Sequence, residues 1–400
     1  MNRAIACSIA AVVLAGAPLC CRAQSAPASD PQRLTAFALE QHGQYPEAEA
    51  AWNAVLKAHP DDAEANAHIG FLEAREEHYT QAIDHYRRAM ERNPSMPGLR
   101  LNLGLSLFKS GALKQAIAVF TPLLKDQPPS SPEALRLDTL IGVAHYGLGE
   151  YAQAVPYLRR TTANDPQNLP YRLLLAQSCL WSKQYPCVLE VYHQILLLNA
   201  ESAEADMLAG EALDEMNDPA GATLQFRAAV KANPKEPNVH FGLGYLLWSQ
   251  NQFEEAAHEF QAELANVPGH AQALAFLADC DIHLGQTADV RPMIEKALAL
   301  DGGIERAHLD LGILDIQAGK QQEAVGEFKL AEKLNPSDAD VHWRLARLYQ
   351  SMGEKEEATL EFSKTSTIHQ AENDKLLSKL KAAQDRGKPA STVPNLSADE

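Results

Sequence analysis

The sequence has few of the residues and patterns that mark β-sheets, metal centres and enzymes. Aromatic residues make up 6% of its 400 residues, and it contains six cysteines. No alternating run of β-branched residues of useful length occurs, which excludes a mainly β fold. No His-Glu-x-x-His, Cys-x-x-Cys or glycine-rich phosphate loop occurs either. We therefore expect a helical protein that is not an enzyme and that holds no metal or cofactor.

Positive charge is also scarce. The chain carries 35 lysines and arginines against 52 aspartates and glutamates, a net charge of −17. This balance disfavours nucleic acid or an anionic membrane surface as the main partner. Beyond the N-terminal region no apolar run is long enough to cross a bilayer, so we expect no integral membrane span in the mature chain.

The N-terminus has the pattern of an export signal. A positive charge at Arg3 precedes the apolar run 4–19, and Cys21–Arg22–Ala23 is similar to a small-residue cleavage site. The pattern predicts a signal peptide over 1–23, a short linker over 24–28, and a periplasmic or extracellular protein. The alternative is a chain anchored to the membrane through an uncleaved or lipidated N-terminus.

The dominant feature of the sequence is a ladder with a period of 34 residues. A large apolar residue lies eight positions before each rung, a small or compact one twelve before, and Gly or Ala twenty-four before. One step, between the third and fourth rungs, is four residues longer. A fixed period of this length indicates a stack of similar units. The rungs are Pro60, Pro94, Pro128, Pro166, Ala200, Pro234, Pro268, Gly302 and Pro336.

Each recurring residue type has a physical reason. Small residues at two positions let a pair of antiparallel helices approach closely, and the large apolar residue fills the wedge between one hairpin and the next. Proline ends the second helix. Residues that tolerate a left-handed backbone lie between the two helices of most units. These turn residues are Gly43, Gly111, Gly149, Asn217, Asn251, Gly285, Gly319 and Gly353.

In this pattern the chain resembles the tetratricopeptide repeat (TPR) proteins of the exported bacterial type. The copy at 63–96 carries the family's residues at Gly70, Ala82, Tyr86 and Pro94. The resemblance implies an all-α fold, a right-handed α-solenoid of about ten helix–turn–helix repeats with a C-terminal capping helix. The expected organisation is repeats one to three over 29–130, a Pro/Ser-rich insert over 131–134, repeats four to ten over 135–372, the capping helix over 373–386 and a disordered tail over 387–400.

The resemblance also implies a binding groove. In TPR proteins the first helix of each repeat lines a concave face, with repeat positions 2, 5, 9, 12 and 13 facing inward. The alternative is that several of these residues pack between adjacent helices. Asn102 alone matches the family's carboxylate-gripping positions, without matching lysines nearby, so we expect a partner with apolar anchors instead. The predicted groove residues are Phe71, Leu105, Phe108, Tyr146, Trp181, Phe241, Tyr245 and Trp248.

Two cysteines, Cys179 and Cys187, lie nearly symmetrically about the turn of the fifth repeat near Lys183. Antiparallel helices could bring them face to face, which makes a disulfide one hypothesis. Two ordinary buried thiols are the other. The next repeat has a crowd of acidic residues on its first helix, which could receive a basic segment of a partner. They are Glu201, Glu204, Glu211, Asp214 and Glu215.

Taken together, the sequence favours a non-catalytic protein–protein interaction scaffold in the bacterial cell envelope. A protein or peptide segment would lie in the concave groove. One alternative is a structural, self-assembling component whose groove is incidental. The other is an accessory subunit of an envelope enzyme complex. Because repeats of this kind serve unrelated ligands, the fold alone does not identify the partner.

Overall fold

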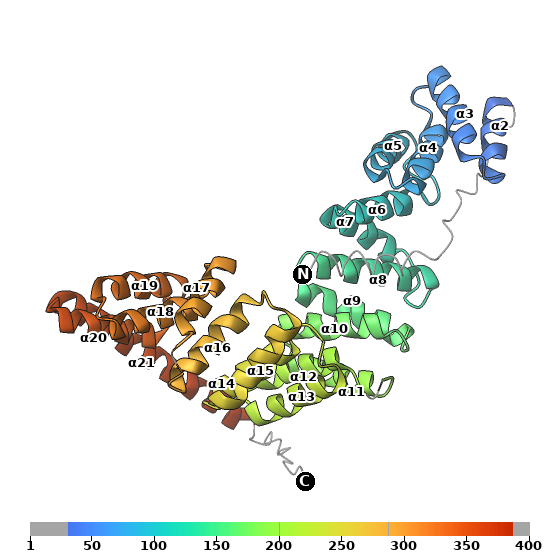
Figure 1. Cartoon of the computed structure of the whole chain (residues 1–400). Coiled ribbons are helices and arrows are strands. Elements are labelled where there is room, and N and C mark those ends of the chain that lie inside the picture. The colour runs from blue at the N-terminus through green and yellow to red at the C-terminus, as the bar shows by residue number, and fades with distance from the viewer. Residues whose placement is uncertain (1–30, 200, 287, 387–400) are drawn as a thin grey trace, which may run out of the picture. The chain divides into compact units, whose positions relative to one another are not determined.

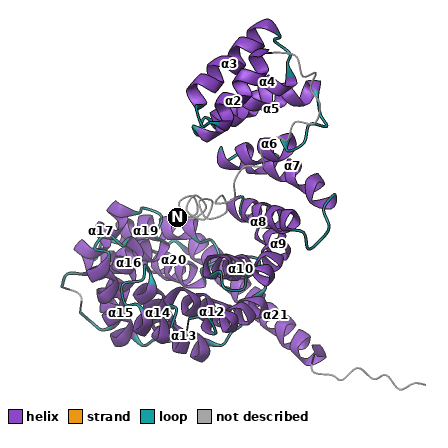
Figure 2. Ribbon diagram, turned by 90° about the vertical axis from the view of Figure 1, so that its right-hand side faces the viewer, coloured by secondary structure: helices purple, strands orange, loops and turns teal. Residues whose placement is uncertain are grey.

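The computed structural model describes residues 31–199, 201–286 and 288–386, and Figures 1 and 2 show that they are built from helices joined by short loops. These residues form twenty α-helices and no strand, which confirms the predicted all-α repeat fold. The signal and linker predicted for 1–28 and the tail predicted for 387–400 lie outside the described residues. Among the described helices, none combines the length and the apolar character that crossing a bilayer requires.

The chain divides into two compact units, and the first ends at Ala232. Its twelve described helices form six consecutive pairs, each the helical hairpin of one repeat. The helices are α2 (Pro31–Gln41), α3 (Tyr45–Ala58), α4 (Ala63–Arg75), α5 (Tyr79–Arg92), α6 (Leu99–Lys109), α7 (Leu113–Lys125), α8 (Pro132–Gly147), α9 (Tyr151–Asn164), α10 (Leu169–Trp181), α11 (Tyr185–Leu196), α12 (Ala203–Glu215) and α13 (Pro219–Ala232).

The second unit begins at Asn233 and holds four further pairs. In both units each helix packs against its partner in the hairpin, and the first helices of some neighbouring repeats also contact each other, as α10 does α12 and α16 does α18. The helices of the second unit are α14 (Val239–Ser249), α15 (Phe253–Asn266), α16 (Ala271–His283), α17 (Val290–Leu300), α18 (Glu305–Gln317), α19 (Gln321–Leu334), α20 (Ala339–Met352) and α21 (Lys355–Arg386).

In five of the hairpins the two helices cross where a glycine meets an aromatic residue. A Cβ atom on Gly104 would lie 2.4 Å from Cε1 of Phe120, and one on Gly312 would lie 2.4 Å from Cε1 of Phe328. Both rings are fully buried. The ring therefore covers the glycine of its own hairpin, a contact that the sequence analysis did not foresee. It can also reach the next hairpin, since Phe260 lies 5.8 Å from Phe276 between ring centroids.

The turn inside every hairpin contains one residue with a left-handed backbone. All eight predicted turn residues have a positive φ, and the two remaining hairpins use Glu77 (φ 63°) and Lys183 (φ 60°) at the same place. A side chain with a Cβ atom is disfavoured in this conformation. The hairpin geometry therefore imposes the turn even where the sequence lacks glycine or asparagine.

Polar side chains begin many of the first helices. Asp62 accepts a hydrogen bond from the Ala65 amide, Ser131 from the Ala134 amide, and Asn168 from the Tyr171 amide. Such a cap satisfies one of the amides that a helix N-terminus leaves without an internal partner. The cap lies two places after the repeated proline at Asp62 and Asn168, and three places after it at Ser131, where the period is interrupted.

Two segments differ from the predicted organisation. The insert predicted for 131–134 is not a separate linker, because Ser131 caps α8 and residues 132–134 form the first turn of that helix. The capping helix predicted for 373–386 is not a separate helix, because it continues α21 without a break. No glycine or proline occurs between Lys355 and Arg386, so nothing in the sequence ends α21 earlier.

Candidate functional site

In the second unit, four aromatic side chains from α14 and α16 contact one another. The centroid of Tyr245 lies 5.7 Å from that of Trp248 and 5.4 Å from that of Phe276, and Trp248 lies 4.9 Å from Phe276. Phe241 joins them at 6.0 Å from Phe276. We call these four residues the aromatic cluster. Tyr245 is 41% exposed, whereas the other three are half-buried, so the cluster offers a partly open apolar surface.

Charged groups border the aromatic cluster on one side. The Trp248 indole N–H donates a hydrogen bond to Asp279, and the Arg306 guanidinium lies 4.9 Å from the centroid of the Trp248 ring. Arg306 also lies 3.8 Å from Asp279. A cation over an indole ring is attracted by the ring's electron-rich face. These contacts hold Trp248 in one orientation at the edge of the cluster.

Below Arg306 lies Asp310, a carboxyl group with no exposed surface. Burial raises its pKa well above the ordinary aspartate value, and the negative charge of Asp279 raises that pKa further while Arg306 opposes the effect. When ionised, neither oxygen of Asp310 has a hydrogen-bond partner among the described residues. In the protonated form the carboxyl group donates a hydrogen bond to Asp279.

The predicted groove residues of the first unit are not all accessible. Trp181 is 42% exposed, but Tyr146 is 3% exposed and Phe108 is 7% exposed. The Tyr146 hydroxyl donates a 2.6 Å hydrogen bond to Gln177, and burial raises its pKa to about 12. The prediction that Phe108 and Tyr146 line an open groove is therefore wrong. Both side chains pack into the core of the first unit instead.

The structure brings together two of the other predicted residues. Phe71 of α4 and Leu105 of α6 line one pocket of about 250 Å³, together with Asn102, Arg75 and Lys109. Lys109 thus lines the same pocket as Asn102. Arg75 and Lys109 occupy position 13, one of the inward positions, in two consecutive repeats.

The acidic residues on α12 form an exposed row in the first unit. Glu211, Asp214 and Glu215 are exposed, and Glu215 accepts a 3.0 Å hydrogen bond from the hydroxyl of Tyr185. Glu204 accepts a 2.8 Å hydrogen bond from the Gln177 amide. Solvated carboxylates on a helix surface are common without a ligand, so this row supports no site by itself.

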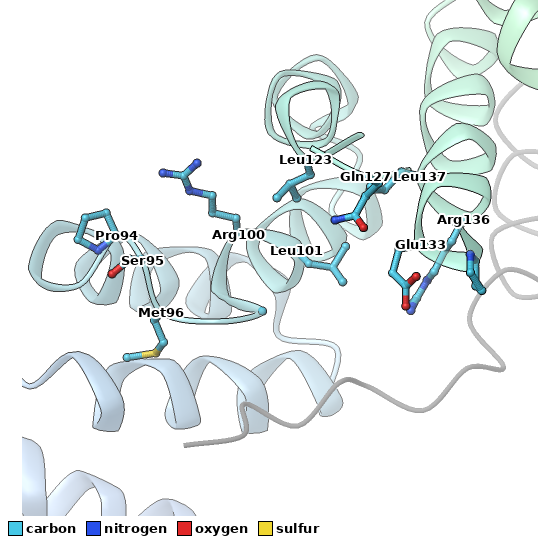
Figure 3. A pocket seen from close by; sticks show the side chains of 12 residues that line it. Pro94, Ser95, Met96, Arg100, Leu101, Leu123, Gln127, Glu133, Arg136 and Leu137 are labelled. Atoms are coloured by element: carbon cyan, nitrogen blue, oxygen red, sulfur yellow. The ribbon is translucent and has the colours of Figure 1, made fainter. Parts of the chain in front are cut away.

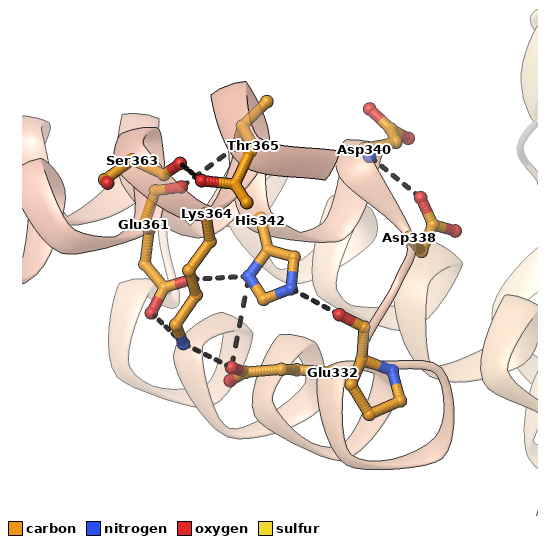
Figure 4. Close-up of polar contacts among 10 residues, drawn as sticks. Glu332, Asp338, Asp340, His342, Glu361, Ser363, Lys364 and Thr365 are labelled. Carbon is orange, nitrogen blue, oxygen red and sulfur yellow. Dashed lines mark hydrogen bonds and ion pairs between the residues drawn. The ribbon is translucent and has the colours of Figure 1, made fainter. Parts of the chain in front are cut away.

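One group of side chains in the described residues has the composition of a metal site. Ligand atoms of Glu332, His342 and Glu361 lie within 4.8 Å of one another. Figure 4 shows the Lys364 ammonium between the two carboxylates, at 2.6 Å from Glu332 and 2.8 Å from Glu361. A side-chain cation thus already compensates the charge that a metal ion would neutralise.

The histidine of this group belongs to a recurring structural pair. His342 lies 2.6 Å from Glu361, and the same positions pair His308 with Glu327 at 2.7 Å and His240 with Glu259 at 2.6 Å. Each pair joins the first helix of a repeat to the second. The pair recurs in repeats that have no counterpart of Glu332 or Lys364. It is therefore explained as a contact between the two helices of a hairpin, and we assign no metal to it.

The structure joins Cys179 and Cys187 in a disulfide across the fifth hairpin, with Cα atoms 5.8 Å apart. The separation of the Cα atoms lies within the range that a disulfide requires. Cys280 is a free, buried cysteine, and burial raises the pKa of its thiol to about 12. A thiol so strongly disfavoured as a thiolate is a poor nucleophile.

Sequence reasoning missed three residues on the first helices of the second unit. Phe276 completes the aromatic cluster but lies at repeat position 6, which is not among the inward positions of the family. Arg306 and Trp343 lie at positions 2 and 5, and reading the last repeats as the earlier ones were read would have found them. Trp343 is 46% exposed, with the Arg347 guanidinium 5.7 Å from its ring centroid.

Curated relatives share low sequence identity with this chain over long stretches. The BBSome complex member BBS4 of Bos taurus is 22% identical over 315 residues, which are 78% of this chain and 59% of that protein. The cellulose synthase operon protein C of Xanthomonas axonopodis pv. citri is 25% identical over 348 residues, 84% of this chain and 20% of that protein. The chain thus spans less than two thirds of the length of these relatives.

Solved structures and family models give the remaining comparisons. A tetratricopeptide repeat protein from Parabacteroides merdae aligns with a TM-score of 0.49 and 17% identity, over 66% of this chain and 97% of that chain. A chain of the APC/C hetero-tetramer Cut9-Hcn1 aligns with a TM-score of 0.45 and 12% identity, over 86% and 87%. Two models described as tetratricopeptide repeat match residues 35–97, 139–185, 207–271 and 241–303, and residues 74–141. These matches cover more than half of the chain, which therefore belongs to the tetratricopeptide repeat family.

Proposed function

We propose that the chain is a non-catalytic scaffold that holds a segment of a partner protein against the aromatic cluster. The observation that carries this proposal is the set of four contacting rings on α14 and α16, with Tyr245 open to solvent. Tetratricopeptide repeats bind protein partners, and aromatic residues dominate the energy of such interfaces. They supply a large contact area at a low cost in conformational entropy.

The chemistry of the cluster favours a segment with apolar or aromatic anchors. Three of the rings are half-buried and held by their neighbours, so little ordering is needed on binding. An extended segment or one face of a helix can place its anchors on such a surface. Trp181, the exposed aromatic residue of the first unit, is a second candidate contact.

We further propose that the protein is exported and works in a bacterial envelope. The charged, apolar and small-residue segments of 1–23 support this location. Replacing the apolar run 4–19 by a polar segment should keep the protein in the cytoplasm. Recovery of that variant outside the cytoplasm, in the amount seen for the wild type, would refute the proposed export.

An accessory role beside an envelope enzyme is a second candidate. It is favoured by the likeness to the cellulose synthase operon protein C, which covers 84% of this chain. Self-assembly is the other alternative. Sedimentation of the purified protein distinguishes the accessory role from self-assembly, since a monomer at micromolar concentration argues against self-assembly.

The test of the binding surface is a pull-down from envelope extract with the wild type and a Tyr245→Ala variant. We expect the variant to recover at least tenfold less partner, because removing a hot-spot side chain typically costs 2 kcal/mol or more. The control is Leu330→Ala, which removes a side chain of 44% exposure from the second helix α19. Equal recovery by Tyr245→Ala and wild type, with unchanged helicity, would place the contact elsewhere.

A further inference from the structure

A second cavity lies in the first unit, at the junction of the third and fourth repeats, and it is separate from the aromatic cluster. It has a volume of about 710 Å³ and lies between the start of α6, the end of α7 and the start of α8. Figure 3 shows Leu101 and Leu123 between the Pro94–Met96 turn and the first turn of α8. This volume is within the range typical of small-molecule sites, roughly 300–1,000 Å³.

The cavity arises where the repeat pattern is interrupted. The four extra residues before the fourth repeat extend α8 to 16 residues, whereas α4, α10, α12, α16 and α18 have 13. Pro132 and Glu133, in the added first turn, form part of the cavity wall. The interruption therefore supplies two of the residues that line this cavity.

Most of the wall is apolar. Leu101 comes from α6, Leu123 from α7 and Leu137 from α8, and Met96 and Pro94 close one side from the preceding turn. Each buried CH₂ group of a ligand is stabilised by about 0.8 kcal/mol in such surroundings. The cavity can therefore take an apolar body of substantial size.

Two arginines, Arg100 on α6 and Arg136 on α8, also line the cavity. Neither forms a hydrogen bond or an ion pair with any residue that the structure describes, and Nε of Arg136 is buried without an acceptor. Several other arginines of this unit are paired, as Arg160 is with Asp138 at 2.6 Å. Arg100 is exposed and Arg136 is half-buried, and both contribute positive charge to the cavity wall of a chain whose net charge is −17.

We infer that this cavity binds a small amphiphilic anion, an apolar molecule that carries one carboxylate. The leucines contact the apolar body, and Arg136 and Arg100 bind the carboxylate, for which the guanidinium fork is well suited. Glu133 is the one carboxylate in the wall, and it is exposed. It weakens the attraction for an anion but leaves a net charge of +1 among the three charged side chains.

Binding is tested on the full chain with the fluorescent anion 8-anilinonaphthalene-1-sulfonate and its displacement by decanoate. Decanamide, which has the same apolar body and no charge, is the matched ligand. We expect decanoate to displace the dye at a concentration at least tenfold lower than decanamide does. The Arg100→Gln/Arg136→Gln variant should lose at least tenfold in decanoate affinity and less than twofold in decanamide affinity, since a charge-assisted hydrogen bond contributes about 1.5–3 kcal/mol.

Three controls make the result decisive. Lys114→Gln removes an exposed cation outside the cavity and should change neither affinity. Met96→Trp fills the cavity and should abolish displaceable dye binding. Arg136→Lys keeps the positive charge but loses the paired N–H donors of the guanidinium group. It replaces the double variant in the test if the double variant does not fold.

The inference is overturned by any of three results. Decanamide binding as tightly as decanoate, or decanoate binding that survives loss of both arginines, would remove the carboxylate from the assignment. Undiminished dye binding by Met96→Trp would move the site elsewhere. A peptide with an apolar C-terminus that displaces the dye more tightly than decanoate would replace the small molecule by a polypeptide.

Discussion

The first helices of the fifth and sixth repeats, α10 and α12, and those of the seventh and eighth, α14 and α16, have the same place in the repeat but different surfaces. The former pair presents Trp181 beside a row of carboxylates, whereas the latter presents the aromatic cluster. Beneath both surfaces the crossing residues are alike, with Phe226 against Gly210 and Phe260 against Gly244. The comparison teaches that scaffold and surface vary independently, and the predictions below test this separation.

The largest effect should follow from removing a scaffold ring. Phe260→Ala should lower the free energy of unfolding by about 3–5 kcal/mol, because a fully buried ring is replaced by a cavity. Tyr245→Ala, on the surface above it, should cost less than about 1 kcal/mol while still losing partner recovery. Urea denaturation of both variants measures the difference, and similar losses would show that surface and scaffold are not separable.

A disulfide in the fifth repeat would distinguish it from the seventh, which has no cysteine. Reduction should lower the stability by about 2–3 kcal/mol, the typical contribution of a bond that closes a short loop. Trypsin cleaves after Lys183, so an unreduced digest should contain the two cysteine peptides as one linked species. Finding them as separate thiol peptides would leave the alternative of two buried thiols.

Two glycines of the second unit should respond oppositely to alanine. Gly312→Ala should cost about 1–3 kcal/mol, because the added Cβ atom would lie 2.4 Å from Phe328. Gly326→Ala in α19, where a Cβ atom meets nothing within 4 Å, should gain about 0.5–1 kcal/mol. Midpoints of urea unfolding measure both changes. A loss at Gly326 would contradict the packing derived for the hairpin.

The hairpin turns of the fifth and seventh repeats, at Lys183 and Asn251, offer a smaller contrast. Lys183→Gly should stabilise the protein by about 1 kcal/mol, since lysine carries the cost of a left-handed backbone that glycine avoids. Asn251→Gly should change stability by only a few tenths of a kcal/mol, because asparagine tolerates this conformation. Thermal unfolding curves compare the two, and equal shifts would argue against strain at Lys183.

A pH dependence of stability should also arise in the second unit. Burial, opposed by Arg306 and assisted by the nearby Asp338, raises the pKa of Glu305 to about 7. The folded protein therefore retains a proton that the unfolded chain loses near its ordinary value of 4.5. Stability from this group is complete below pH 4.5 and is lost as pH rises through about 7. Glu305→Gln should flatten this part of the stability profile, and an unchanged slope would assign it to another group.

The sequence was sufficient to predict the fold because the fold depends on local, repeated signals. Small residues at the crossing and turn residues recur at fixed spacing, and the ten helix pairs follow them. Glu77 and Lys183 escaped prediction because the hairpin overrides their backbone preference. The continuity of α21 was missed because a repeat boundary was assumed where no residue ends a helix.

The site was less predictable because burial depends on neighbours in three dimensions. Tyr146 and Trp181 occupy similar places in their repeats, and their ring centroids lie 5.8 Å apart. Tyr146 is nevertheless buried and donates a hydrogen bond to Gln177, whereas the indole of Trp181 is exposed. No periodic pattern distinguishes these two outcomes. The cavity beside Arg136 likewise depends on an interruption of the period. In the sequence this interruption is visible only as one repeat spacing that is four residues longer than the others, which does not predict a cavity.

The left-handed turn residue has a consequence for how such a chain can evolve. Because one backbone angle sets the reversal inside each hairpin, a change in length can be accommodated at the outer end of a hairpin, as it is in the lengthened first turn of α8. A whole 34-residue unit can then be duplicated, lost or exchanged without redesigning its interior. The surfaces of individual units are therefore free to diverge after duplication, and a new specificity can arise in one hairpin while its neighbours keep theirs.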